Sequence, residues 1–327
     1  MKTTIGQAIS QYLDTIAMAR SENTARTYRN ALTAFSAVLD DHHLPTGNIA
    51  VEDLPEDAIA WFAAALKPYA PTTERLYLTA AYNLYEFIAA ERLGTPNLPR
   101  LRLLIRQRAR KQGQRLPQFP RDNIEIITEY AINLANLSVN DPSEHLRNLR
   151  DRALLITLAD TGLRIHEACS LRRGDLDWNE GKAVIIGKGD KQAVVRFSQR
   201  SMTALRDYLT ARSKLDGGSG RPLSALPIFA RHDRGAGKKV KPITPTTGRN
   251  IVDQRLREAL GETAAGTITP HSFRHYFVTT VLRASGGNLK LAQELARHRN
   301  ITVTQRYAHL SDDELDQGYW QIFDNQT

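Results

Sequence analysis

Apolar residues recur every three or four positions through the first hundred residues of the chain, a spacing typical of amphipathic helices. In the segment 24–39 this spacing gives one apolar face, formed by Tyr28, Leu32, Phe35 and Leu39. The segment 71–94 starts with Pro-Thr-Thr, stops at Gly94 and has a second such face, formed by Leu76, Ala80, Leu84 and Phe87. No strand-like alternation occurs before residue 180, so we expect a small helical domain here.

Helical patterns resume after residue 120, in the segments 124–137, 148–176, 244–260, 272–285, 288–298 and 302–310. Between them, residues 182–198 (KAVIIGKGDKQAVVRFS) contain two short β-branched runs around Gly-Lys-Gly-Asp-Lys, which predicts a β-hairpin. The expected fold is therefore mainly α, with a small β-sheet or hairpin in the C-terminal domain.

The chain has 327 residues, enough for two domains, and its composition changes sharply at residues 100–115. This run, RLRLLIRQRARKQGQR, holds seven arginines or lysines and no acid, and the proline-containing LPQFPRD follows. We expect a helical domain at 1–99, a basic linker at 100–117, a second domain at 118–310 and a tail at 311–327. The run is either a flexible solvated linker or a strap across a phosphate backbone. In the second case its DNA-contacting residues would be Arg100, Arg102, Arg106, Arg108, Arg110, Lys111 and Arg115.

Lysine and arginine number 44 against 35 acidic residues, a formal net charge of +9 with a pI near 9.7. This excess favours a nucleic-acid partner over a membrane, because each neutralised phosphate releases counterions; a soluble protein that is merely basic is the alternative. The single cysteine, Cys169, excludes an internal disulfide, and no apolar run resembles a signal peptide or a membrane span. We expect a cytoplasmic protein.

Several residues of the second domain suit the cleavage of a phosphodiester without a metal. Such a reaction needs planar cations to stabilise the charged oxygens, a proton donor for the leaving 5′-oxygen, and a nucleophile that can hold the phosphoryl group. The chain supplies candidates in order: Arg164 and Glu167, then Lys188, then His271 and Arg274 one helical turn apart, then His298 and Tyr307.

Taken singly, each candidate has an ordinary structural explanation. Arg164 and Glu167 could form a surface ion pair, and Tyr307 could be a half-buried packing residue. His271 and His275 lie four residues apart, but the HExxH glutamate and an acidic third ligand nearby are absent. GAGKK (235–239) lacks the pattern of a phosphate-binding loop. We therefore expect no metal and no cofactor.

The ordered combination resembles the tyrosine recombinase (phage integrase-type) family. TGLRIHEACSL is similar to the family's TGLR-x-x-E-L box, GKGDK to its hairpin lysine turn, PHSFRH to its H-x-x-R box, and His298 with Tyr307 to its last histidine and tyrosine. The motifs cover about residues 120–310. The segment TYRNALTAF resembles the helical, SAM-like core-binding domain, which with the catalytic domain would form a clamp around DNA.

The resemblance implies a role for each residue. Arg164 and Arg274 would clamp the scissile phosphate, and His271 and His298 would hydrogen-bond it. Lys188, favoured over the nearby Lys191 by its spacing from Arg164, would protonate the leaving oxygen. Tyr307 would form a 3′-phosphotyrosyl bond, and Glu167 would support the first arginine without reacting.

The sequence departs from the family pattern in three places. Ala296-Arg297-His298 replaces the usual Leu-Gly-His, so Arg297 could alter the backbone or add a phosphate contact. His166 stands where small polar residues are common. The tail DELDQGYWQIF does not match a motif of the family. Its apolar residues could pack on the same chain or on a neighbouring protomer.

The function that we expect is site-specific DNA recombination by a tetramer, with Xer-like dimer resolution favoured and with an accessory or heteromeric recombinase as a further partner. A mobile-element integrase or transposon recombinase of the same build is the main alternative. A non-catalytic DNA-binding relative and a monomeric type IB topoisomerase-like enzyme are the other two. A complete residue set speaks against the first of these, and the helical domain and amphipathic tail speak against the second.

Overall fold

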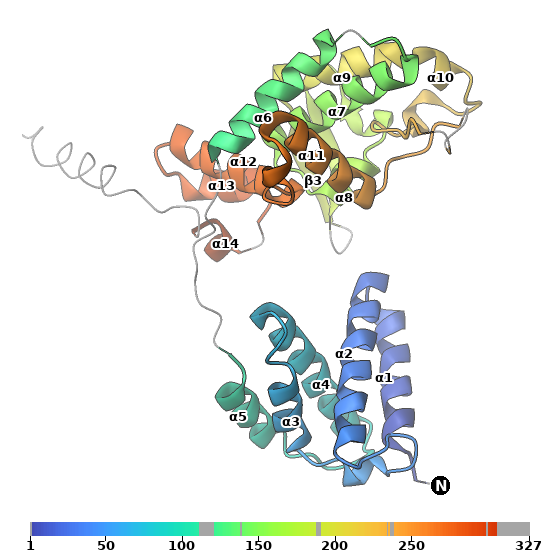
Figure 1. Cartoon of the computed structure of the whole chain (residues 1–327), viewed down its shortest axis with the longest axis vertical. Helices are drawn as coiled ribbons and strands as arrows, with labels where there is room; N and C mark the ends of the chain where they lie inside the picture. Colours follow the sequence, from blue (N-terminus) through green and yellow to red (C-terminus); the bar gives the residue numbers. More distant parts are fainter. Residues whose placement is uncertain are drawn as a thin grey trace, which may run out of the picture. The chain divides into compact units, whose positions relative to one another are not determined.

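In a computed structural model of the chain, the structure describes residues 2–110, 121–137, 139–187, 191–233, 235, 239–298 and 300–305. The chain divides into two compact units, Met1–Arg115 and Leu116–Thr327, which are described separately below (Figure 1). Within the described ranges, no helix combines the length and the apolar character needed to cross a membrane.

The first unit is a bundle of helices. They are α1 (Ile5–Ala19), α2 (Glu22–Asp41), α3 (Ala58–Ala65), α4 (Pro71–Ala90) and α5 (Leu98–Arg108), with a 3₁₀ turn, η1 (Val51–Asp53). Side chains cap several helix starts, because the first amides of a helix have no intrahelical partner. Thr4 and Gln7 form a capping box on α1, Ser21 caps α2 and Asn97 caps α5. These caps fix where the predicted helices begin.

The apolar face predicted for residues 24–39 is confirmed, since Leu32, Phe35 and Leu39 are fully buried in the core of the first unit. The face predicted for residues 71–94 is partly wrong. Leu76 is 43% exposed, whereas Leu78 and Leu84 are buried. Residues two apart on a helix point in nearly opposite directions, so a face centred on Leu78 turns Leu76 to solvent.

The expectation of a linker from residue 100 onward needs correction, because that segment begins as helix α5 of the first unit. Leu101 is fully buried there, and Leu98, Leu104 and Ile105 pack against the same core. The arginines between these residues made the apolar face of the helix hard to recognise in the sequence. The end of α5 is held by Glu74, a fully buried carboxylate on α4 that accepts hydrogen bonds from the Arg110 amide (3.0 Å) and from Lys67 (2.9 Å). Burial raises the pKa of Glu74, but these hydrogen bonds outweigh it and lower the pKa to about 2.

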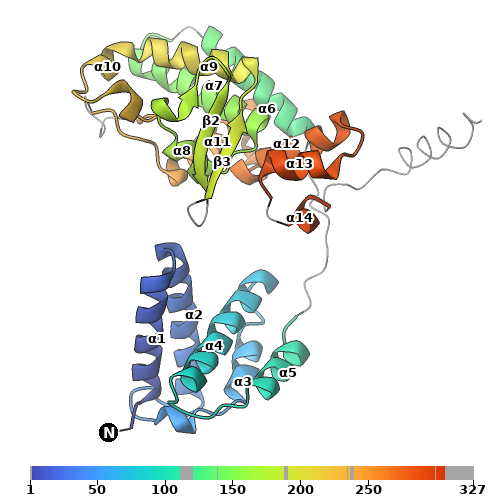
Figure 2. The same ribbon diagram turned by 180° about the vertical axis from the view of Figure 1, so that it is seen from behind.

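The second unit packs helices around a small sheet (Figure 2). Its helices are α6 (Arg121–Asn133), α7 (Pro142–Thr161), α8 (Ile165–Ser170), α9 (Gln199–Ala211), α10 (Ser213–Gly217), α11 (Pro245–Leu260), α12 (Pro270–Ala284), α13 (Leu289–Ala296) and α14 (Ile301–Gln305). Short 3₁₀ turns are η2 (Leu134–Asn136), η3 (Arg173–Asp175), η4 (Leu223–Ala225) and η6 (Glu262–Ala264). Helices α6, α7 and α11 contact one another, and α12 packs on α7 and α13. The expected mainly α fold with a small sheet is confirmed.

The predicted hairpin is confirmed as β2 (Lys182–Gly187) and β3 (Lys191–Arg196), which pair antiparallel with Val184 opposite Val194. Alternate residues Ala183, Ile185 and Val195 are buried in the core, as a half-buried strand requires. A third strand, β1 (Leu176–Asp177), pairs with β2 and was not expected from the sequence. Two residues are too few to show alternation.

Buried ion pairs fix the central helices of this unit. Asp151 on α7 accepts from Arg255 on α11 (2.7 Å) and from the adjacent Arg150 (2.8 Å). Arg255 also donates to Asn148 (2.8 Å). Such pairs are strongly destabilised when one partner is removed, so they hold α7 and α11 in one arrangement. Both helices lead into the site described next.

Candidate active site

The TGLR motif forms the turn that ends helix α7. Gly162 caps the helix in the left-handed conformation, with φ 58°. A Cβ atom at this position would lie 2.5 Å from Cδ1 of Phe277 on α12, so both the backbone and the close packing require glycine. Leu163 is fully buried next to it. The turn therefore places Arg164 at the N-terminus of α8 with little freedom.

Glu167 contacts both the backbone and the side chain of Arg164. Its carboxylate accepts the Arg164 amide (2.9 Å) and a terminal nitrogen of the Arg164 guanidinium (2.8 Å). The Glu167 side chain is 2% exposed, whereas that of Arg164 is 42% exposed. Burial raises the pKa of Glu167, but the hydrogen bond from the Arg164 amide and the charges of Arg297 and Arg164 have a larger, opposite effect. The pKa of Glu167 is therefore below its ordinary value. The carboxylate stays ionised and orients an exposed arginine.

Helix α12 carries the H-x-x-R motif beside this turn. Pro270 occupies the first turn, where its missing N–H costs nothing, and His271 and Arg274 follow on one face. Arg274 is buried, and its guanidinium donates to the carbonyl oxygens of Gly162 (2.6 Å) and Ala296. These bonds tie three separate segments, the ends of α7 and α13 and the middle of α12, to one arginine.

His298 follows helix α13. Its amide donates to the Gln293 carbonyl (3.0 Å), and its Nδ1 lies 2.9 Å from the hydroxyl oxygen of Thr304, which is fully buried on α14. A partner on one ring nitrogen fixes the orientation of the imidazole. The ring is thus held between α13 and α14.

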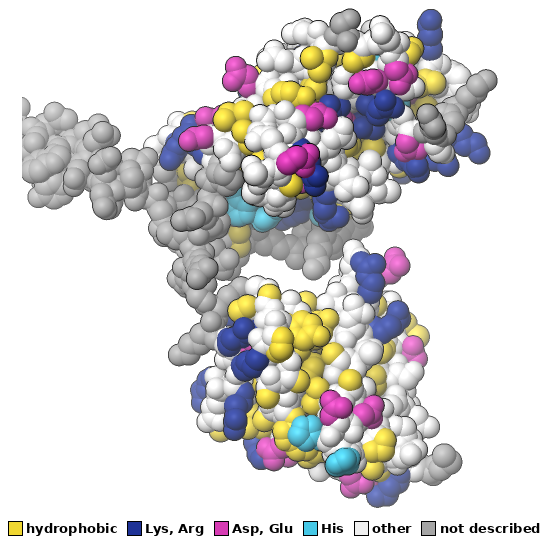
Figure 3. Space-filling view, in the orientation of Figure 1, with side chains coloured by type: hydrophobic (Ala, Val, Ile, Leu, Met, Phe, Trp, Pro, Cys, Tyr) yellow, Lys and Arg dark blue, Asp and Glu magenta, His cyan; other side chains and the backbone are white. Residues whose placement is uncertain are grey.

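A cavity of about 230 Å³ opens where these elements meet. It is lined by Arg164, Ile165, His166, Arg249, Thr269, Pro270, His271 and Arg274. Arginines and histidines supply its charged and titratable groups, so the cavity suits a phosphate. Figure 3 shows histidine side chains beside arginine and lysine on the surface of the second unit. Arg249 and Thr269 were not predicted from the sequence, because neither lies in one of the four motifs.

The histidines of the site are neutral at pH 7. Burial, together with Arg274 and Arg164, lowers the pKa of His298 to about 4. The same causes lower the pKa of His271 below its ordinary value. Burial and the neighbouring His271, whose ring centroid is 4.3 Å away, lower the pKa of His275 to about 4. A neutral ring can donate a hydrogen bond to a phosphate without bringing a positive charge to the site. It can also accept a proton and become a cation.

The structure brings together four predicted residues, Arg164, Glu167, His271 and Arg274, with His298 tied to Arg274 through α13. Two others, Lys188 and Tyr307, lie outside the described residues, as do Lys111, Arg115 and the tail 311–327. The strand residues Gly187 and Lys191, which precede and follow Lys188 in the sequence, pair with each other. Among the described residues, no group of three or more potential ligands is placed to hold a metal ion.

The arginines of the basic run differ in their surroundings. Arg100 pairs with Glu56 (3.0 Å) and Asp57 (2.8 Å), and Arg102 donates to the hydroxyl of Tyr82 (2.7 Å). Arg110 binds the buried Glu74. Exposed Arg106 and Arg108 form no ion pair within the described part of the chain. DNA contact by this run stays a prediction, for which these last two are the best placed.

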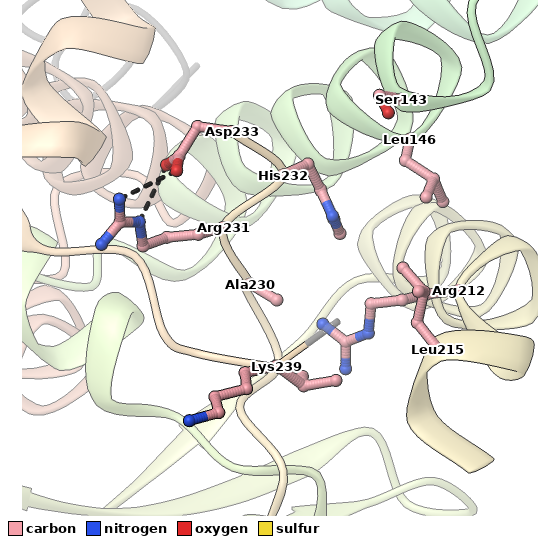
Figure 4. A pocket seen from close by; sticks show the side chains of 10 residues that line it. Ser143, Leu146, Arg212, Leu215, Ala230, Arg231, His232, Asp233 and Lys239 are labelled. Atoms are coloured by element: carbon pink, nitrogen blue, oxygen red, sulfur yellow. Dashed lines mark hydrogen bonds and ion pairs between the residues drawn. The ribbon is translucent and has the colours of Figure 1, made fainter. Parts of the chain in front are cut away.

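Another cavity, of about 140 Å³, lies elsewhere in the second unit and has a structural explanation (Figure 4). The fully buried Arg212, one of its lining residues, donates to Asp216 (2.8 Å), to the Ile228 carbonyl (2.8 Å) and to the Pro227 carbonyl (2.8 Å). Arg231, another lining residue, is paired with Asp233 (2.8 Å). None of the predicted site residues lines it.

Comparison with known proteins bears on the whole chain. The model described as "Phage integrase family" matches residues 132–314, and that of the "Phage integrase, N-terminal SAM-like domain" matches residues 9–92. A protein named tyrosine recombinase XerC from Bacillus pumilus (strain SAFR-032) is 33% identical over 264 residues, 75% of this chain and 78% of the relative. One named tyrosine recombinase XerD from Brucella melitensis biotype 1 is 27% identical over 311 residues, 94% of each chain.

Solved structures share the fold. XerH site-specific recombinase bound to a palindromic difH substrate superposes with a TM-score of 0.66 at 18% identity, covering 90% of this chain and 79% of that one. A lambda integrase (75-356) dimer bound to a COC′ core site gives 0.64 at 18% identity, covering 94% and 95%. The motifs, the helical fold with its three-stranded sheet and the match over more than half of the chain agree. The chain therefore belongs to the phage integrase family, the tyrosine recombinases.

Proposed function

We propose that the chain is a site-specific DNA recombinase that cleaves and rejoins strands through a 3′-phosphotyrosyl bond to Tyr307. The observation that carries the proposal is the arginine-lined cavity on which α8 and α12 converge, with His298 and α14 fixed close by. Tyr307 follows the buried Thr304 by three residues. The proposal requires the phenol of Tyr307 to reach the phosphate that this cavity would bind.

In the proposed reaction Arg164 and Arg274 bind the non-bridging oxygens of the scissile phosphate. Charge grows on these oxygens in the transition state, and preorganised guanidiniums stabilise it without reorganising. Glu167 keeps Arg164 in place, and Arg274 is held by carbonyl oxygens of two elements. The cations are thus placed before DNA arrives.

The phenolic oxygen of Tyr307 forms a bond to phosphorus as the bond to the 5′-oxygen breaks. Lys188 gives a proton to that leaving oxygen, and a neutral imidazole, His271 or His298, can accept the phenolic proton. The phosphotyrosyl bond conserves the energy of the phosphodiester. Attack by a free 5′-hydroxyl then reseals a strand without ATP.

For the biological role we propose Xer-like resolution of chromosome or plasmid dimers by a tetramer on two DNA sites, in the cytoplasm. Support comes from the names of the curated relatives, XerC and XerD. The solved relatives also include a Tn1549 transposon integrase in complex with transposon right end DNA, which keeps a mobile-element role as the alternative. The position of the cleaved site in the host genome, between replication arms or at the end of a mobile element, separates the two.

The first experiment finds and traps the substrate. The full chain is incubated with sheared genomic DNA of the organism that encodes it, covalent complexes are precipitated in detergent, and the bound DNA is sequenced. The recovered site, rebuilt as a nicked duplex that cannot religate, should then give an adduct on a denaturing gel. Tyr307→Phe should give none; an adduct from that variant, or none from the wild type, would show the assignment to be wrong.

Arg164→Ala tests the clamp most cleanly, because Arg164 is exposed and its ion pair is with a glutamate that retains Arg297. We expect unchanged DNA affinity and a cleavage rate lower by about 10²–10³-fold, the usual loss for one donor to a charged transition state. Arg274→Ala should show the same split, but its buried carbonyl partners make a folding check necessary. Loss of binding with normal cleavage per bound complex would contradict a catalytic role.

A further inference from the structure

Arg297 stands where the tyrosine recombinase pattern has glycine, and the backbone there is left-handed. It caps helix α13 with φ 58° and ψ 43°. Glycine enters this conformation without strain, whereas arginine does not. The chain therefore has a strained residue directly before His298. Contacts made by the Arg297 side chain can offset the cost of that strain.

The Arg297 side chain points into the protein. It is only 10% exposed, and its terminal nitrogens lie 3.3 Å from the Gly162 carbonyl oxygen, 3.4 Å from the Glu167 carboxylate and 3.5 Å from the Thr161 carbonyl oxygen. Burial lowers the pKa of Arg297, and the neighbouring Glu167 carboxylate opposes this shift. A guanidinium stays charged in proteins. Arg297 does not line the arginine-containing cavity, so of the two roles left open by the sequence the structure favours the effect on the local backbone over a phosphate contact.

Arg297 shares its acceptors with both predicted clamp arginines. The Glu167 carboxylate that binds Arg297 also accepts from the amide and guanidinium of Arg164. The Gly162 carbonyl that receives Arg297 also receives Arg274 at 2.6 Å. Three arginines therefore meet at one carboxylate and one carbonyl, and Arg297 is the member that does not line the cavity.

Arg297 directly precedes the segment that carries His298 and α14. The residue after Arg297 is His298, whose ring reaches Thr304 on α14, the helix that precedes Tyr307. A guanidinium anchored to the α7–α8 turn fixes the end of α13, and with it the start of this segment. Glycine in the same place would remove the side-chain contacts with the Thr161 and Gly162 carbonyl oxygens and with the Glu167 carboxylate.

We propose that Arg297 is a positioning residue, which ties the His298 segment to the Gly162–Glu167 turn and so sets the rate of strand cleavage without contributing to DNA affinity. The inference rests on the proposed function, since it assigns a rate effect to a site whose chemistry is proposed above. It concerns this chain in particular, because the tie needs a side chain that glycine lacks.

The test compares Arg297→Gly with Arg297→Lys and with a matched control. Arg92→Gly relieves a left-handed arginine of the same kind (φ 56°) on the surface of the first unit, and so reports the effect of removing strain and one positive charge alone. The nicked duplex recovered by covalent trapping is the probe. Single-turnover adduct formation and the equilibrium dissociation constant are measured for each variant, and thermal unfolding confirms that it folds.

Arg297→Gly should form the adduct about tenfold more slowly, the effect of losing one charge-assisted contact, with a dissociation constant within about twofold of the wild type. Arg297→Lys should lie between them and supplies the measurement if the glycine variant unfolds. Arg92→Gly should match the wild type. In a Glu167→Gln background the step from arginine to glycine should cost much less, because the shared acceptor is already changed.

Any of four results would overturn the inference or part of it. If the wild type forms an adduct and Arg297→Gly forms it equally fast, or loses DNA affinity in the same proportion as rate, Arg297 does not position the site. An undiminished glycine effect in the Glu167→Gln background would likewise remove the tie through Glu167. Absence of an adduct from the wild type defeats the proposed function itself and this inference with it.

Discussion

Replacing Gly162 by alanine tests whether the TGLR turn is as tightly constrained as its contacts indicate. The left-handed backbone (φ 58°) makes the added Cβ unfavourable by about 1 kcal/mol. The same atom would stand 2.5 Å from Cδ1 and 2.9 Å from Cγ of Phe277. Ordinary carbon contacts are about 3.5–4.0 Å, so the ring must move by about 1 Å, and overpacking of this kind costs about 1–3 kcal/mol. The expected loss of stability is about 2–4 kcal/mol in total.

Gly286→Ala is the matched control for this substitution. Its backbone has nearly the same φ, 59°, but no heavy atom lies within 4 Å of a Cβ placed there. It should cost the backbone contribution alone, about 1 kcal/mol. The difference between the two variants isolates the clash with Phe277.

Hydrogen exchange of the helix α7 amides, followed by mass spectrometry on the full chain, reports the unfolding free energy of the second unit by itself. Equal losses in the two variants would refute the packing argument, and no loss in either would refute the backbone argument as well. Because the Gly162 carbonyl accepts hydrogen bonds from Arg274 and Arg297, Gly162→Ala should also slow adduct formation.

Two further predictions follow from buried groups. Glu74→Gln should destabilise the first unit by ~3 kcal/mol, the free energy that corresponds to the lowering of the Glu74 pKa from 4.5 to about 2 by its partners Lys67 and Arg110. In the wild type this support is complete above the unfolded pKa of about 4.5 and is lost as the pH falls towards 2, the pKa of folded Glu74, which α4 amide exchange across that range would show. Ring proton signals of His298 should titrate near pH 4, and not near 6.5, in NMR spectra. Unfolded His298 binds a proton more readily than folded His298 between these values, so acidification through this window should weaken the second unit.

Periodicity predicted elements well where one face of a helix meets one core. The buried face of α2 and the alternation in β2 and β3 both follow that rule. It was wrong at Leu76, because α4 contacts α1, α2, α3 and α5, and its buried surface is broader than a single stripe. It was wrong again at α5, where the basic run that starts at Arg100 concealed the helix that buries Leu101.

The sequence indicated candidate residues by their types and their order, but most of the contacts that support them could not be predicted. Local spacing placed His271 and Arg274 on one face and paired Arg164 with Glu167, and the structure has both arrangements. The inward course of Arg297 depends on the end of α7 lying beside the end of α13, more than 130 residues away in sequence. Arg249 enters the cavity in the same way, from a helix outside every motif.

The most direct test of the account is to identify the residue that carries the DNA. The trapped adduct is digested with nuclease and trypsin and analysed by tandem mass spectrometry. Cleavage after Arg306 leaves a peptide with two tyrosines, Tyr307 and Tyr319, so fragmentation must assign the modified one. The account predicts a nucleotide joined through its 3′-phosphate to Tyr307. A nucleotide on Tyr319 or on any other residue, or one joined through its 5′-phosphate, would contradict it.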